Sequence, residues 1–223
     1  ESDIDLLKAT YVIFDVETTG LSSVYDRIIE LSATKMHQGH EIDTFSSFIN
    51  PHQTLSSFTT ELTSITNDMV ANAPEEAQVI KDFAEFSEGC ILVAHNASFD
   101  IGFLSQAYQR HLNRKCEQAT IDTLALSRLV NPHLKGHRLN QLAKHYEVNL
   151  EQHHRAIYDA QATGLIFFKL LDQAIEDYQM TNHQSLNDQL GKGDAYKQSR
   201  PFHTTLLVKN QEGLKDLFKL ISL

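Results

Sequence analysis

The chain has 223 residues, of which 41% are hydrophobic and 22% charged, and this composition excludes a disordered or collagen-like protein. Its 19 basic and 29 acidic residues leave a net charge of −10. This charge argues against a module that holds DNA by bulk electrostatics, because phosphate binding rests mainly on Lys and Arg. It is compatible with an enzyme that meets phosphates through metal ions, since such cations need carboxylate ligands.

Three features of the sequence concern its location. The two cysteines are too few for a disulfide framework, and the apolar runs fall well short of the about 20 residues that span a bilayer. Residues 1–5 are acidic where a signal peptide is basic. We therefore expect a cytoplasmic protein without a transmembrane helix.

The first part of the chain predicts three strands. Residues 11–17 are rich in β-branched and aromatic side chains, which is typical of a buried strand. Residues 27–36 and 41–49 predict two more strands. The turn at 37–40 between them is short, so we expect this pair to be antiparallel.

From residue 74 onward, helices and strands alternate. Apolar residues recur with a helical period up to Phe86, and residues 90–94 form a short, wholly apolar strand. Ser98 is a candidate N-cap for the next helix. The remaining predicted elements are a strand near 120–121 and helices at 122–130, 139–146 and 156–175. This order predicts a mixed α/β sheet flanked by helices.

The end of the chain predicts a domain boundary. Residues 177–200 lose periodicity and are predicted to be a linker. The strand at 203–208 and the helix at 212–223 that follow cannot bury their own apolar faces, so we assign them to a neighbouring domain. The chain then divides into a flanking segment, a main domain, a linker and a partial domain, at 1–9, 10–176, 177–200 and 201–223.

Two acids stand within the first predicted strand. Asp15 and Glu17 are two residues apart and so share one face, with Val16 turned to the other. Two such charges about 5 Å apart repel by roughly 3 kcal/mol at an effective dielectric of 20, and a divalent cation would offset this. The alternative is the exposed end of an edge strand, where both acids are merely solvated.

Further acids stand at the starts of helices. Asp100 falls in the first turn of the helix after strand 90–94, and Asp159 in the first turns of the longest helix, just after His154. An acid there usually complements the helix dipole, but ligands of open α/β sheets also gather at the carboxyl ends of strands. Asp122 also follows a strand, and for it we favour a structural or capping role.

Residues 15–20, residues 95–100, and His154 with Asp159 together resemble the three motifs of the DnaQ-like DEDDh exonuclease family. The resemblance covers residues 10–176 and implies a ribonuclease H-like fold with a mixed five-stranded sheet. It implies removal of nucleotides one at a time from 3′ ends with two divalent metal ions, Mg²⁺ or Mn²⁺. Carried over residue by residue, it makes His154 the general base and assigns the metal ligands as Asp15, Glu17, Asp100 and Asp159.

A closer resemblance is to the proofreading exonuclease of PolC-type bacterial replicative polymerases. It rests on residues 10–30, 50–52, 62–66 and 152–159. In those polymerases the exonuclease lies within a PHP domain, and residues 200–223 are similar to the place where that domain resumes. The implied partners are a single-stranded or mismatched DNA 3′ end and the remainder of the polymerase chain. No PHP activity is expected, because the other PHP metal-ligand motifs are absent from the sequence.

The resemblance also implies the substrate contacts. In the family, the backbone after the first motif and the apolar residues of the 62–66 segment hold the terminal nucleotide. The predicted contacts are Thr18, Thr19, Leu62, Ile65 and Asn96, although Leu62 and Ile65 could equally be plain helix core. The predicted function is proofreading 3′→5′ exonuclease activity that releases nucleoside 5′-monophosphates from DNA. The alternatives are an RNA-trimming DEDDh exonuclease and a catalytically silent module of a polymerase.

Overall fold

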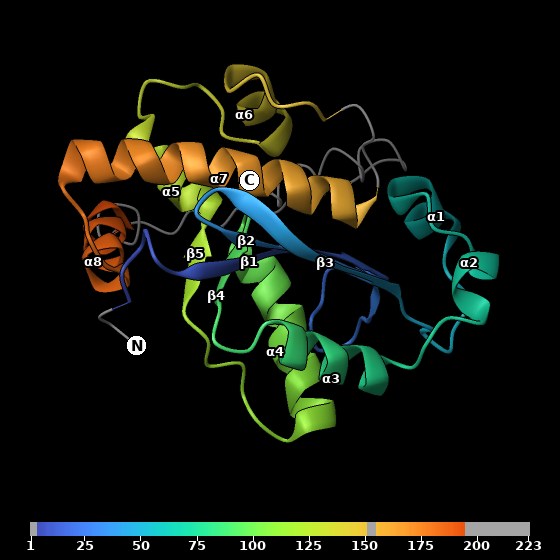
Figure 1. The fold of residues 1–223 in the computed structure, drawn as a ribbon. Helices are drawn as coiled ribbons and strands as arrows, with labels where there is room; N and C mark the ends of the chain where they lie inside the picture. Colours follow the sequence, from blue (N-terminus) through green and yellow to red (C-terminus); the bar gives the residue numbers. More distant parts are fainter. Residues whose placement is uncertain (1–3, 151–154, 195–223) are drawn as a thin grey trace.

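The computed structural model describes residues 4–150 and 155–194. Its centre is a five-stranded sheet in the order β3-β2-β1-β4-β5, with helices on both faces (Figure 1). The strands are β1 Thr10–Thr18, β2 Ile28–His37, β3 His40–Phe48, β4 Ile91–Ala94 and β5 Thr120–Asp122. Each predicted strand within the described residues is therefore present.

The sheet is mixed, as predicted. Strand β2 pairs antiparallel with both β1 and β3, whereas β4 pairs parallel with β1 and β5. The β2–β3 turn is built on Gln38 and Gly39, whose φ angles of 49° and 82° are both in the left-handed region. Two central residues with positive φ are typical of a type I′ hairpin, whose twist matches that of the strands.

Helices cover both faces of the sheet. In chain order they are α1 Ser57–Thr63, α2 Asn67–Ala71, α3 Glu76–Phe86, α4 Ala97–Leu112, α5 Thr123–Val130, α6 Leu139–His145, α7 Ala156–Tyr178 and α8 His183–Asp194. Helix α7 crosses one face, α3 and α4 lie on the other, and α1 and α2 lie beside the sheet (Figure 1). None of the described helices is both long enough and apolar enough to cross a membrane.

The alternation of strand β1 divides the core between these two faces. Tyr11 and Ile13 are buried with Phe167 of α7, whereas Val12 and Phe14 are buried with α3 and α4. Because side chains alternate along a strand, the residues that continue the Tyr11 and Ile13 face must also meet α7. Those residues are the two acids of the first motif.

The prediction that Ser98 caps α4 is wrong. The helix begins at Ala97, and its N-cap is Asn96, which has φ 62° and ψ 54°. The carboxylate of Asp122 accepts the backbone N–H of Asn96 at 2.9 Å, and this bond helps to hold the left-handed conformation from which the helix starts. The start of α4 thus depends on a residue far along the chain.

The structure also corrects the expectation of an irregular segment at 177–200. Helix α7 continues to Tyr178, and residues 183–194 form helix α8. Leu186 of α8 is buried in the core, and the backbone N–H of His183 bonds to Ile4 O at 3.1 Å. Leu190, one helical turn later, is partly buried against the same core, and the rest of the helix carries no large apolar residue, so its sequence shows only a weak apolar period. The strand and helix predicted beyond residue 200 lie outside the described residues.

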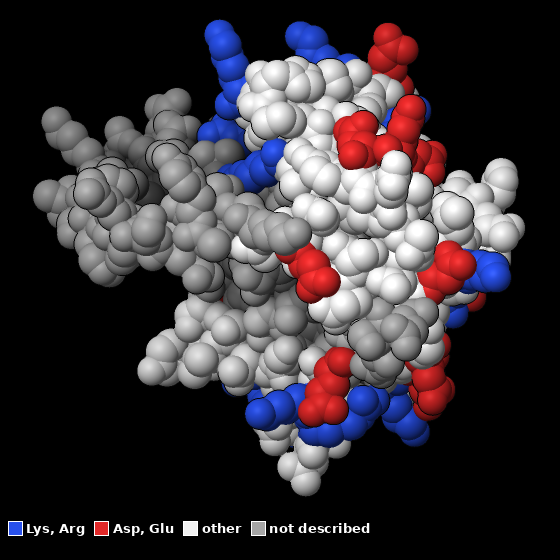
Figure 2. Space-filling view, turned by 90° about the vertical axis from the view of Figure 1, so that its left-hand side faces the viewer, with Lys and Arg blue, Asp and Glu red and all other residues white. Residues whose placement is uncertain are grey.

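Figure 2 shows how the charged side chains of the described residues are distributed on one face of the molecule. On the face shown in Figure 2, acidic and basic side chains of the described residues lie scattered around a largely uncharged area. This described face therefore offers no continuous basic stripe of the kind that holds DNA through its phosphates alone.

Candidate active site

The two acids of β1 lie in the interior of the sheet. Strand β1 has β2 on one side and β4 on the other, so it is not an edge strand. Val16 is buried on the α3 and α4 face, and Asp15 and Glu17 point to the α7 face, half-buried. The prediction that both acids share one face is confirmed, and the alternative of a solvated edge is wrong.

Helix α7 adds a third carboxylate. Asp159 lies in its first turn, where the helix packs across β1 and β2. Asp15, Glu17 and Asp159 each offer a carboxylate oxygen, and these oxygens all lie within 4.8 Å of one another. Such an oxygen-only set suits a hard divalent cation. The fold thus gathers residues from opposite ends of the chain into a cluster able to hold a metal ion.

Asp100 is tied directly to β1. The parallel ladder between β1 and β4 ends at Ile13 and Val93, and beyond it the Asp100 carboxylate accepts the backbone N–H of Val16 at 3.2 Å. The side chain is buried, and burial raises the pKa of Asp100 to about 8, although the bond from Val16 lowers it. Asp100 is therefore held beside the residue that separates Asp15 from Glu17.

Burial and mutual repulsion also raise the pKa values of the strand acids. The pKa of Asp15 lies well above its ordinary value, first because of burial and then because of the charges of Asp100, Glu17 and Asp159. Burial likewise raises the pKa of Glu17, followed by the charges of Asp159 and Glu30. These carboxyls therefore favour their protonated forms, and a cation among them would favour ionisation.

Glu30 is a site residue that the sequence reasoning missed. It is buried in β2 directly opposite Glu17, with only 1% of its surface exposed. Its carboxylate accepts bonds from Arg155 Nε at 3.2 Å and from the backbone N–H of Ala156 at 2.8 Å. A carboxylate inside an apolar strand requires such partners, and this was the available signal. Glu30 thus fastens the start of α7, and with it Asp159, to the sheet.

The hairpin after the first motif is closed by side chains. Thr18 Oγ1 donates to Gly20 O at 2.6 Å, and Thr19 Oγ1 donates to Asp26 Oδ1 at 3.4 Å. Thr59 Oγ1 of α1 donates to Thr19 O at 3.1 Å, which fastens α1 to the end of β1. Both threonines therefore lie just beyond the acids, where the substrate contacts were predicted.

The two apolar contacts predicted in the 62–66 segment have different environments. Ile65 is fully buried with Ile29, Leu55 and Val70, the environment of a core residue. Leu62, in α1, is half-buried and keeps an accessible surface. In this arrangement Ile65 faces the core, as the alternative interpretation held, whereas Leu62 remains partly accessible.

Asp122 has the capping role that the sequence favoured. It is the N-cap of α5, and its Oδ1 accepts the backbone N–H of Leu124 at 2.9 Å. The same oxygen accepts the backbone N–H of Asn96. Asn96 itself is half-buried at the start of α4. His154, the predicted general base, lies outside the described residues.

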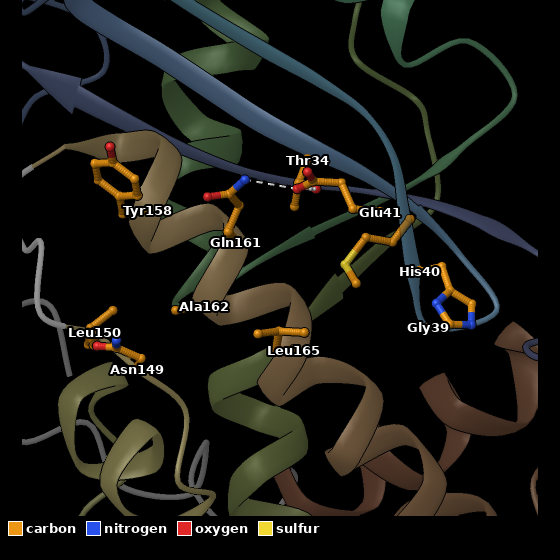
Figure 3. A pocket seen from close by; sticks show the side chains of 11 residues that line it. Thr34, Gly39, His40, Glu41, Asn149, Leu150, Tyr158, Gln161, Ala162 and Leu165 are labelled. Atoms are coloured by element: carbon orange, nitrogen blue, oxygen red, sulfur yellow. Dashed lines mark hydrogen bonds between the residues drawn. The ribbon is translucent and has the colours of Figure 1, made fainter.

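A separate cavity of about 590 Å³ lies between the β2–β3 hairpin and α7 (Figure 3). At its polar corner, Glu41 Oε2 accepts bonds from Thr34 Oγ1 at 2.7 Å and Gln161 Nε2 at 2.9 Å. Tyr158 and Leu165 of α7 supply part of its apolar lining. The acidic cluster does not line this cavity, so we locate the candidate active site at the cluster.

Comparison with known proteins identifies the family of the chain. A family model described as "Exonuclease" matches residues 12–167. The chain is 53% identical to DNA polymerase III PolC-type of Oceanobacillus iheyensis over 222 residues, and 52% identical to that of Bacillus subtilis over 219 residues. The matched regions make up 100% and 98% of this chain but only 16% and 15% of the length of the two relatives.

Solved structures give the same fold. Exonuclease X in complex with 5′ overhanging duplex DNA has a TM-score of 0.61 at 26% identity, covering 80% of this chain and 99% of that one. E. coli Exonuclease I in complex with a dA16 oligonucleotide has a TM-score of 0.65 at 16% identity, covering 83% and 43%. The mixed five-stranded, ribonuclease H-like fold is thereby confirmed. The chain belongs to the exonuclease family, as its motifs predicted.

Proposed function

We propose that this chain is a metal-dependent 3′→5′ exonuclease domain that releases nucleoside 5′-monophosphates from DNA. One observation carries the proposal: the carboxylates of β1 and α7 converge within 4.8 Å of one another, and Asp100 of α4 is hydrogen-bonded to the backbone between the two strand acids. Burial and mutual repulsion make the ionised form of these carboxyls unfavourable, and a bound cation would offset that free-energy cost.

The donor set fits divalent cations. Asp15, Glu17, Asp100 and Asp159 provide only oxygen ligands, which favour Mg²⁺ or Mn²⁺ over zinc. Two such ions, when bound, would activate a water and neutralise the charge that develops on the leaving 3′ oxygen. His154, just before α7, takes the proton of the attacking water through its neutral imidazole.

The residues around the acids hold the end of the strand. Thr18 and Thr19 present the hairpin backbone, and Leu62 packs against the terminal nucleotide. Asn96, at the start of α4, faces the same end of the sheet. Ile65 packs in the core with Ile29 and Val70 instead of touching the substrate.

We further propose that the domain proofreads for a PolC-type polymerase in the bacterial cytoplasm. Its relatives at over 50% identity are parts of a much longer chain, and residues 10–176 would be the exonuclease with PHP-domain sequence at 201–223. A tethered domain receives its DNA at a high effective concentration, so a net charge of −10 is no obstacle. An unpaired 3′ end is drawn into the site at lower cost than a paired one.

The decisive experiment uses a labelled primer with a mismatched 3′ end. We expect stepwise shortening with Mg²⁺ or Mn²⁺, none with EDTA, and none with Asp15→Asn. Asp172→Asn, an exposed acid on α7, is the matched control and should behave like wild type. Faster degradation of an RNA oligonucleotide would favour RNA trimming, and no cleavage at all would favour a silent module.

A further inference from the structure

The β1–β2 hairpin carries an unusual concentration of exposed apolar surface. Leu21, Val24 and Tyr25 are 37%, 56% and 85% exposed, and they are three of the eight large hydrophobic residues exposed in the described chain. Folding leaves such side chains in water singly and at scattered places, so a group within five residues points to a binding surface.

The hairpin is nevertheless ordered by its own hydrogen bonds. Asp26 Oδ2 accepts the backbone N–H of Ser22 at 2.9 Å, and the N–H of Asp26 bonds back to Ser22 O at 2.7 Å. Arg27 Nη1 donates to Asp26 O at 3.1 Å and to Val24 O at 3.5 Å. Tyr25 therefore projects from a fixed backbone, and little ordering remains to be done when a ligand arrives.

The hairpin also stands beside the acidic cluster. The backbone N–H of Thr19 donates to Arg27 O at 2.9 Å across the hairpin. Thr19 lies two residues after Glu17, and Arg27 lies two residues after Tyr25. At about 3.3 Å per residue, the Tyr25 backbone lies within roughly 20 Å of Glu17. On its other side, Ser23 lies 3.6 Å from the place that a Cβ on Gly102 would occupy, in the helix that carries Asp100.

We propose that Tyr25 is a stacking platform for an unpaired base of the DNA strand, a few nucleotides before the 3′ terminus. This inference rests on the proposed function and extends it beyond the terminal nucleotide. An aromatic ring suits this ligand because every base has a π-face, so stacking tolerates any sequence, as a proofreader requires. The half-buried Arg27 beneath the hairpin adds a positive charge for the backbone of the same strand.

The test compares Tyr25→Ala, Tyr25→Phe and the control Tyr178→Ala. Tyr178 is 39% exposed at the far end of α7, roughly 28 Å along the helix from Asp159. Binding of fluorescent oligo(dT) is measured by anisotropy with Ca²⁺ in place of the catalytic ion. Hydrolysis is measured on the same oligonucleotide and on the p-nitrophenyl ester of thymidine 5′-monophosphate, which has no preceding base.

We expect Tyr25→Ala to raise Kd and KM for oligo(dT) by about 5- to 150-fold and to leave hydrolysis of the ester unchanged. Tyr25→Phe keeps the ring and should match wild type, as should Tyr178→Ala. Unchanged oligo(dT) binding in Tyr25→Ala would overturn the proposal and would indicate that the exposed residues of the hairpin bind a protein partner instead. A Phe variant as weak as Ala, or an equal loss on the ester, would overturn it too. Failure of wild type on both substrates would reject the proposed function, and the Kd comparison would still decide the role of Tyr25.

Discussion

The carboxylate of Glu30 accepts the backbone N–H of Ala156 at 2.8 Å, joining β2 to the first residue of α7 across 126 positions of sequence. The same carboxylate holds Arg155, the N-cap residue of α7, at 3.2 Å. Asp159 follows in the first turn of the helix, so its distance to Asp15 depends on this contact. Glu30 therefore positions a carboxylate of the proposed metal site without being part of the cluster.

We expect Glu30→Gln to lower the free energy of unfolding by about 1–3 kcal/mol, because a charged acceptor is replaced by a neutral one. We also expect kcat to fall by about 10²-fold, since a shift of about 1 Å in a reacting group has that effect. Urea unfolding, Mn²⁺ titration and primer degradation measure the three quantities. Glu41→Gln, which alters another strand carboxylate with two hydrogen bonds, is the control. Loss of stability with unchanged kcat and Mn²⁺ affinity would limit Glu30 to supporting the fold.

Metal binding should stabilise the fold, because the acids repel one another and are poorly solvated. At a hundredfold excess over Kd the gain should be about 2.7 kcal/mol. The measurement is the rise in Tm on adding Mn²⁺, compared between wild type, Asp15→Ala and Asp172→Ala. The rise should be much smaller only in Asp15→Ala. An equal rise in all three would show that the ions bind elsewhere.

Without metal, stability should fall as pH rises. Burial raises the pKa of Asp100 from 3.8 to about 8, so between these values the native state holds a proton that the unfolded chain has lost. The free energy of unfolding therefore decreases with pH across this window and is largest at its acidic end. Urea unfolding in EDTA should show the decrease, and Asp100→Asn should reduce it. A wild-type stability that increases from pH 5 to pH 8, or an identical slope in Asp100→Asn, would contradict this assignment.

His154→Ala should lower turnover by roughly 10²–10⁴-fold and leave the binding of Mn²⁺ and single-stranded DNA unchanged. A general base acts in its neutral form, so wild-type activity should climb as pH rises through the pKa of the histidine, and the variant should lose that step. His153→Ala is the control and should keep both the rate and the step. If the whole defect of His154→Ala were lost metal affinity, His154 would be a ligand and the carboxylate-only centre would be wrong.

Alanine substitutions of Leu62 and Ile65 should have different effects on stability and on substrate binding. Ile65→Ala should cost about 2–5 kcal/mol of stability, because it empties a fully buried position among Ile29, Leu55 and Val70. Leu62→Ala should cost less stability and instead raise KM several-fold for oligonucleotides. Urea unfolding and steady-state kinetics on oligo(dT) give the two readouts. If Ile65→Ala instead raised KM and left stability unchanged, Ile65 would be a substrate contact.

The sequence alone was sufficient for the strands, most helices and the acidic cluster. Asp15 and Glu17 share a face because side chains alternate along any strand, and the apolar residues around them mark that strand as buried. Asp100 and Asp159 could be linked to them through motifs whose order and spacing resemble one family. Each of these features depends on a short stretch of neighbouring residues. The strands can therefore be predicted from local periodicity, and the acids from local motifs.

Only the tertiary structure decided the role of Glu30, the burial of Ile65, the start of α4 and the packing of α8. Glu30 meets Arg155 across 125 positions, and Asn96 takes its left-handed conformation with a bond to Asp122. Helix α8 has only two large apolar residues, Leu186 and Leu190, and both pack against elements from distant parts of the chain. Each of these outcomes depends on contacts between distant segments, and no local pattern of residues specifies which distant group will satisfy a buried carboxylate or cover the two leucines of α8.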